Sequence, residues 1–174
     1  GAAETTVGAW ATGGSINSAR DTLAGSGVQT AALIFGGQAP NSALTESYNG
    51  TSWTEVNDLN TARNGLAGVG TSTSSLAYGG EPITAVTESF NGTNWTEVND
   101  LNTARRNLSG AGVDNTSALA FGGAAPNTQT ELWNGTNWTE VNDLNAGRGY
   151  AAGFGTSTAA IFTGGLPATA ATES

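Results

Sequence analysis

A chain of 174 residues with 26 glycines, five tryptophans and only 11% charged residues has the composition of one small β-rich domain, not of a disordered segment. Its net charge of −9 and complete lack of Lys argue against nucleic acid or an anionic membrane as partner, because both need clustered cations. The absence of Cys and His removes disulfides, thiolate chemistry and imidazole catalysis.

A repeat of 42 or 43 residues runs through almost the whole chain. Its most regular block is WTEVNDLNTAR, present from Trp53 to Arg63 and from Trp95 to Arg105, with the close copy WTEVNDLNAGR from Trp138 to Arg148. A degenerate copy, WATGGSINSAR, runs from Trp10 to Arg20. Self-similarity at this period indicates a repeat architecture.

Each repeat contains four short segments with strand character. The first is small and Gly-rich, and its copies begin at Leu23, Leu66, Leu108 and Ala151. The second ends in Gly-Gly, the third reads TESY, TESF or TELW, and the fourth begins with the repeated Trp. Asn-Gly at positions 49, 91 and 134 separates the third from the fourth and favours a type I′ turn, with positive φ at both residues.

Four strands in every 42 or 43 residues match the size of a propeller blade. The sequence therefore predicts an all-β fold, a four-bladed β-propeller of four-stranded antiparallel blades. All of residues 1–174 form one domain in this prediction, with repeats at approximately 10–52, 53–94, 95–137, and 138–174 plus 1–9.

The first and last repeats are incomplete in complementary ways. The last copy offers three strands, and the strand around Trp10 has no neighbours of its own. We expect this N-terminal strand to complete the last blade and so hide an exposed sheet edge. Two alternatives stay open: a fragment of a longer array, or two chains pairing into an eight-bladed ring.

The order of Gly-Gly, an aromatic residue and then a Trp resembles the kelch family. The aromatic residues are Tyr48, Phe90 and Trp133, each five residues before the Trp. The repeat is shorter than is usual for kelch, and the gap from the aromatic residue to the Trp is compressed. WTEVNDLNTAR, together with GTSTAA and FGG, also resembles kelch-like repeat proteins of tailed marine viruses. This resemblance implies a virion or extracellular location.

Two charged positions recur once per repeat and are predicted to form structural ion pairs. A carboxylate can hold a guanidinium in bidentate geometry, and an Arg present in every blade suits a structural support better than a single catalytic site. The alternative is a cationic cluster for an anionic ligand, as in sialidase-type propellers. The residues are Arg20, Arg63, Arg105 and Arg148, with Glu46, Glu88, Glu131 and Glu173.

The repeated Trp side chains are predicted to fill contacts between neighbouring blades, although Trp can also stack on sugars. They are Trp10, Trp53, Trp95 and Trp138. The Asn-Asp pairs beginning at 57, 99 and 142 offer oxygen ligands for a hard cation, but the first repeat has Gly14-Ser15 there. We expect these pairs to shape turns, and we expect no metal site and no cofactor.

No catalytic residue is predicted. Copper-radical chemistry and serine hydrolysis need Cys or His, and the acids that break the repeat symmetry are not brought together by the sequence; they are Asp21, Glu81 and Asp114. The sequence instead diverges after each Gly-Gly: QAPNSAL, EPITAV, AAPNTQ and LPATAA. Variable loops on a constant scaffold are typical of an interaction module, although drift in unimportant loops gives the same pattern.

The predicted function is therefore non-catalytic binding of a glycan or protein surface, as a monomer or as one copy within a larger assembly such as a viral appendage. The candidate ligand-binding residues lie in the variable loops and are Gln38, Asn41, Glu81 and Asn127. The alternative is an enzyme of the sialidase or sugar-isomerase kind that uses the Arg positions.

Overall fold

The computed structural model describes residues 12–38, 40–124 and 127–174, in which all regular structure is β-strand. The fifteen strands are β1 (Ala24–Val28), β2 (Ala31–Phe35), β3 (Thr45–Tyr48), β4 (Trp53–Val56), β5 (Ala67–Gly70), β6 (Ser75–Tyr78), β7 (Thr87–Phe90), β8 (Trp95–Val98), β9 (Ser109–Asp114), β10 (Ser117–Phe121), β11 (Thr130–Trp133), β12 (Trp138–Glu140), β13 (Ala152–Thr156), β14 (Ala159–Thr163) and β15 (Thr172–Glu173).

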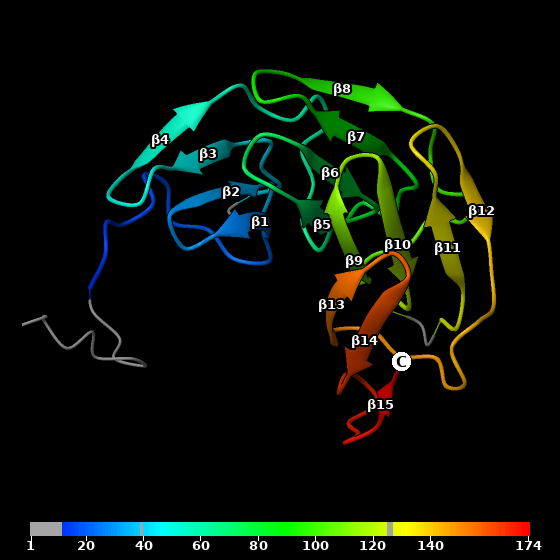
Figure 1. Ribbon diagram of the computed structural model, residues 1–174. Coiled ribbons are helices and arrows are strands. Elements are labelled where there is room, and N and C mark those ends of the chain that lie inside the picture. The colour runs from blue at the N-terminus through cyan, green and yellow to red at the C-terminus, as the bar shows by residue number, and fades with distance from the viewer. Residues whose placement is uncertain (1–11, 39, 125–126) are drawn as a thin grey trace, which may run out of the picture.

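The strands form four antiparallel sheets in chain order, which confirms the predicted four-bladed β-propeller. Blades 1, 2 and 3 are the four-stranded sheets β1–β4, β5–β8 and β9–β12, and blade 4 shows β13–β15. Figure 1 shows the blades arranged around a common centre, with β1, β5, β9 and β13 innermost and β4, β8 and β12 at the periphery. The predicted completing strand around Trp10 lies outside the described residues.

The hydrophobic core is divided among the contacts between successive blades. One cluster joins blades 1 and 2 around Phe35 and Trp95, a second joins blades 2 and 3 around Tyr78 and Trp138, and a smaller third cluster joins blades 3 and 4 around Phe121. Short strands of small residues build no core within a single sheet, so each blade depends on its neighbour for burial.

Paired glycines shape the bend after the second strand of each blade. In blade 2, Gly79 and Gly80 have φ of +67° and +126°, which residues with a Cβ rarely adopt. This conformation lets the Gly80 N–H donate to the carbonyl of Arg105, in the segment that leads on to blade 3. The Gly-Gly repeat thus couples the end of one strand to the link between blades.

The predicted Asn-Gly hairpins are present, but the expected type I′ turn is wrong. The loop between β3 and β4 has four residues, and only its glycine, Gly50, has positive φ. The Asn49 Oδ1 accepts hydrogen bonds from the backbone N–H groups of Thr51 and Ser52 at 3.0 Å. The Asn49 side chain therefore caps the loop through these two hydrogen bonds. Within the loop, only Gly50 takes the left-handed backbone conformation.

Candidate binding face

The repeated Arg residues are buried, and each is paired with a repeated Glu. Arg63 Nη1 lies 2.5 Å from Glu88 Oε1, and Arg105 Nη2 lies 2.8 Å from Glu131 Oε1. The same contact recurs at 2.5 Å between Arg20 and Glu46 and at 2.9 Å between Arg148 and Glu173, and all four Arg side chains are at most 2% exposed.

The expected bidentate geometry is wrong, because an Asn occupies the second carboxylate oxygen. Asn60 donates both its backbone N–H and its side-chain amide to Glu88 Oε2, at 2.7 and 2.8 Å. Equivalent bonds run from Asn17 to Glu46, Asn102 to Glu131 and Asn145 to Glu173. Each Glu thus binds the repeated Arg through one carboxylate oxygen. Through the other oxygen it binds the Asn at the start of the segment that contains this Arg.

These contacts also set the ionisation of the buried groups. Burial alone raises the pKa of Glu46, but the hydrogen bonds from Arg20 and Asn17 outweigh it and leave this pKa below its ordinary value. Burial lowers the pKa of Arg105, which the adjacent Glu131 carboxylate opposes. The lowered pKa favours the charged carboxylate of Glu46, and the burial of all four arginines leaves them unable to form an open anion site.

The repeated Trp side chains fill contacts between blades where the structure describes a preceding blade. Trp95 lies 4.8 Å from Phe35 between ring centroids, and its Nε1 donates to Thr45 Oγ1 at 3.0 Å. Trp138 repeats this arrangement with Tyr78 and Thr87. Trp53 is half-buried and contacts Tyr48, whereas Trp10 lies outside the described residues.

The Asn-Asp pairs were expected to shape local turns, but their Asp side chains instead bind the start of the third strand of their own blade. Asp58 Oδ1 accepts from the Thr45 N–H, and Asp100 Oδ1 accepts from the Thr87 N–H, both at 3.0 Å. Within residues 12–38, 40–124 and 127–174, no three His, Cys, Asp or Glu residues gather as metal ligands do. The same part of the chain contains no helix with the length and hydropathy to cross a membrane.

The variable loops share one face with a second set of variable residues. Backbone bridges join Asp21 to Gln38, Asn64 to Glu81 and Gly149 to Leu166, and the Ala124 N–H donates to the Arg106 carbonyl. Each bridge links a loop after Gly-Gly to the dipeptide that follows a repeated Arg. We call this surface the loop face.

At the centre of the loop face, four residues joined in a row by three backbone hydrogen bonds lie at the end of the channel between the inner strands. The Gly65 N–H donates to the Thr22 carbonyl, Asn107 to Gly65, and Tyr150 to Asn107, at 2.7–3.0 Å. These four residues and the leucines beside three of them line a hollow of about 160 Å³, and the leucines are Leu23, Leu66 and Leu108. We call the four residues the mouth. Deeper in the channel, the Gly-rich inner strands of all four blades line further hollows of about 280 and 270 Å³.

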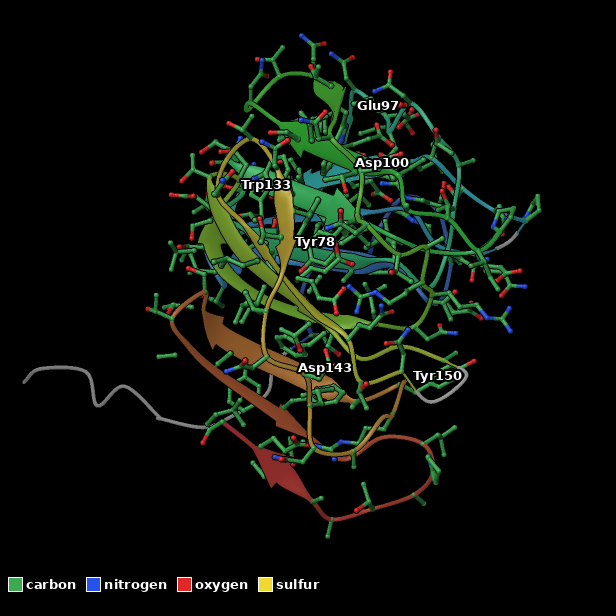
Figure 2. The ribbon with its side chains drawn as sticks, turned by 90° about the vertical axis from the view of Figure 1, so that its right-hand side faces the viewer. Tyr78, Glu97, Asp100, Trp133, Asp143 and Tyr150 are labelled. Carbon is green, nitrogen blue, oxygen red and sulfur yellow. The ribbon has the colours of Figure 1, made fainter. Side chains whose placement is uncertain are left out.

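The mouth holds side chains in a backbone conformation that normally requires glycine. Thr22, Asn107 and Tyr150 have φ of 49°, 51° and 55°, and the second repeat places Gly65 there with φ of 57°. A β-branched or aromatic residue in this region is strained, and strained residues concentrate at functional sites. Tyr150 is 58% exposed and lies toward the outside of the molecule (Figure 2).

The four sequence-predicted ligand residues lie around the mouth but do not line its hollow. Glu81 Oε2 lies 2.5 Å from Arg106 Nη1, Asn41 accepts a hydrogen bond from Asn64, and Asn127 bonds to Gln129. Gln38 is exposed. Three of the four polar side chains are thus partly engaged in holding the loops.

Sequence reasoning missed the mouth and Arg106, although a signal was present. The two residues after each repeated Arg read Asp-Thr, Asn-Gly, Arg-Asn and Gly-Tyr, and they differ in all four copies. This divergence directly follows the most regular block of the repeat. It indicates that the scaffold does not require particular side chains at these two positions.

Comparison with known proteins identifies no family for this chain. No protein-family model matches the chain, and a search of curated proteins found no significant match. The fold and the loop face therefore carry the argument about function.

Proposed function

We propose that this protein is a non-catalytic binding module that recognises a glycan or protein surface through the loop face. The observation that carries the proposal is that residues recurring in every repeat and residues differing between repeats occupy different parts of the molecule. The repeated Arg and Glu side chains and the tryptophans Trp95 and Trp138 pack within the scaffold, whereas residues that differ between copies gather around the mouth.

The mouth has the chemistry of a modest polar recognition site. Tyr150 offers an exposed aromatic ring, while Asn107, Thr22 and the half-exposed Arg106–Glu81 pair offer donors and acceptors. An aromatic ring beside amide and hydroxyl groups suits the alternating apolar and hydroxyl surfaces of a sugar. A small hollow gives weak affinity for one site, so a kelch-like module displayed in many copies, as on a viral appendage, gains avidity.

The alternative, a sialidase- or sugar-isomerase-like enzyme, would use the repeated arginines to hold substrate. The burial of Arg63 and Arg105 with their Glu partners leaves these guanidinium groups no access to a ligand, which supports the binding proposal.

The proposal is tested by a glycan array and a parallel glycosidase assay on the purified protein. The expected result is binding without turnover. Exchanging the four loops after Gly-Gly for one common sequence should abolish that binding, while exchanging the hairpin residues 49–52, 91–94 and 134–137 should leave it unchanged. Binding that survives the first exchange in a folded protein would reject the loop face, and turnover of a sugar substrate would reject the non-catalytic assignment.

A further inference from the structure

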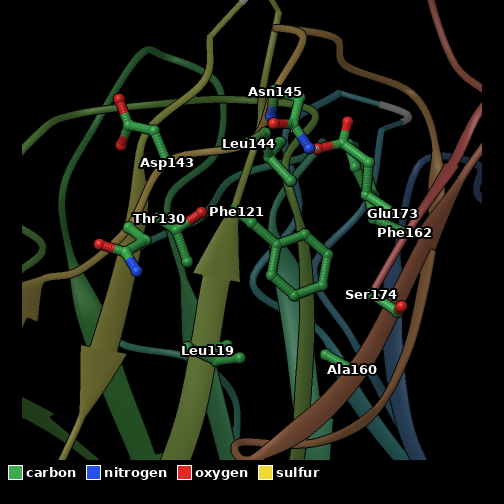
Figure 3. Close-up of a pocket in the computed structure, with 11 residues that line it drawn as sticks. Leu119, Phe121, Thr130, Asp143, Leu144, Asn145, Ala160, Phe162, Glu173 and Ser174 are labelled. Carbon is green, nitrogen blue, oxygen red and sulfur yellow. Dashed lines mark hydrogen bonds between the residues drawn. The ribbon is translucent and has the colours of Figure 1, made fainter.

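The hollows of the described molecule differ in the kind of residue that lines them. A pocket of about 240 Å³ between blades 3 and 4 has scaffold residues in its walls, among them Phe121 and Thr130 (Figure 3). Their counterparts Phe35 and Thr45 contact Trp95 in the core between blades 1 and 2, so this pocket belongs to the contacts between blades. The hollow at the mouth instead brings together the residues that differ in all four repeats.

The hollow at the mouth is too small to enclose a whole ligand. Its volume is about 160 Å³, whereas pockets that enclose small molecules measure roughly 300–1,000 Å³. It therefore has room for one substituent of a ligand, and the rest of the ligand must lie on the surrounding loop face. Tyr150, which lines the hollow and is exposed, offers an aromatic ring to that rest.

The lining of this hollow combines apolar side chains with neutral polar groups. Leu66 and Leu108 are buried and supply apolar surface. A Cβ built on Gly65 would lie 2.5 Å from Asn107 Oδ1, so the Asn107 amide occupies the space that the missing side chain of Gly65 leaves. Among the described residues that line the hollow, none is charged.

The polar groups of the mouth are complementary to a secondary amide. The backbone N–H and carbonyl of Asn107 are bonded to Gly65 and Tyr150, whereas its side-chain amide has both donors and an acceptor to offer. Thr22 Oγ1 donates its hydrogen to Asp21 Oδ1 at 3.1 Å, so towards a ligand it can only accept. A secondary amide presents one C=O and one N–H, which match an amide donor and a hydroxyl acceptor.

We infer that the mouth binds the acetamido group of a neutral N-acetylamino sugar. The methyl group lies against the leucines of the hollow, the C=O accepts from the Asn107 amide, and the N–H donates to Thr22 Oγ1. The apolar face of the sugar ring lies on Tyr150. This inference rests on the proposed binding function and names the group that the loop face recognises.

The charges around the mouth favour a neutral sugar over an anionic one. Asp21 is bonded to Thr22 and places a carboxylate beside the hollow. Arg106, which precedes Asn107 in the chain, is paired with Glu81. The net charge of −9 adds a general repulsion of anions.

Matched sugars on a glycan array test the acetamido assignment, because they differ only in that group. We expect N-acetylglucosamine and N-acetylgalactosamine to bind about tenfold more tightly than glucose and galactose, which leave the polar groups of the mouth unpaired. Equal binding within each pair would overturn the inference and leave the proposed function in place. An array with no bound glycan would also overturn it and leave a protein surface as the ligand, and tighter binding of an acetyl-lysine peptide than of either sugar would overturn the sugar assignment.

Variants of the mouth separate this site from the rest of the loop face. Asn107→Gly removes the amide but keeps a backbone that Gly65 already adopts, so it should fold, bind N-acetylamino sugars about tenfold more weakly and lose the preference within each pair. Gly65→Ala, whose Cβ would displace the Asn107 amide, should act in the same way. Asn94→Gly, the same change at an exposed hairpin residue, is the matched control and should keep both affinity and preference. An Asn107→Gly variant that retains the preference would overturn the inference, whereas loss of binding on exchange of the four loops would still support the loop face.

Discussion

Tyr150 shows how a single residue departs from the repeat at a structural cost. Its left-handed backbone conformation is the one that Gly65 adopts without strain in the second repeat. The hydrogen bond from the Tyr150 N–H to Asn107 does not depend on the side chain. The ring therefore makes no contribution to this hydrogen bond, and the proposed binding function would give it a role.

Tyr150→Gly should raise the free energy of unfolding by about 1 kcal/mol, because it relieves that strain. It should also weaken any glycan binding found on the array. Tyr150→Ala is the control, since it removes the ring but keeps a Cβ at positive φ. Denaturant unfolding and array binding measure both effects. A Gly variant less stable than the Ala variant would contradict the strain argument.

Glu46 gives the protein a predictable acid sensitivity. Its pKa is lowered in the folded state, so its contribution to stability is complete above the unfolded-state pKa, about 4.3–4.5, and is lost as the pH falls through the folded value. The parent should lose more stability between pH 5 and pH 3 than Glu46→Gln does. Urea midpoints across that range measure the difference, and parallel curves would refute the role of this carboxylate.

At the scale of the strand, the repeat predicted nearly all of the regular structure. Alternating strand and turn signals located the strands, and the recurrence of Trp identified the contacts between blades. The sequence did not predict that Asn60 binds Glu88, because an Asn in a turn indicates only a loop-forming residue. The contact becomes visible when the fold places Glu88 beside it. It also misassigned the hairpin turn, since Asn-Gly suits both a two-residue turn and a longer capped loop.

Trp95 is the side chain through which a strand of blade 2 holds blade 1. Trp95→Ala removes its ring contacts and its bond to Thr45, and it should cost roughly 3–5 kcal/mol of unfolding free energy. Val28→Ala, at a strand end 66% exposed, should change stability by less than about 0.5 kcal/mol. Chemical denaturation of both variants makes the comparison, and equal losses would show that blade contacts do not limit stability.

For the whole molecule, the sequence predicted the number of blades and the existence of a variable face, but not how the face is organised. Periodicity specifies elements, whereas the rotation from blade to blade arises from packed side chains such as Phe35 and Trp95. The mouth follows from that rotation, because it joins residues from four separate repeats. The predicted polar residues consequently lie near the site without lining it.

The molecule thus uses repeated residues as scaffold and unrepeated residues as surface, and the two kinds adjoin at Arg105 and Arg106. Arg105 is buried with Glu131, whereas Arg106 and Glu81 are 40% and 37% exposed in their side chains. Removing one member of a buried pair costs roughly 3–5 kcal/mol, and removing one of an exposed pair costs about 0–1 kcal/mol.

The most direct test is urea unfolding of Arg105→Ala and Arg106→Ala beside the parent. The account predicts a large fall in the midpoint for Arg105→Ala and a midpoint close to that of the parent for Arg106→Ala. Equal midpoints for the two variants, or an unaltered midpoint for Arg105→Ala, would contradict the division between scaffold and surface.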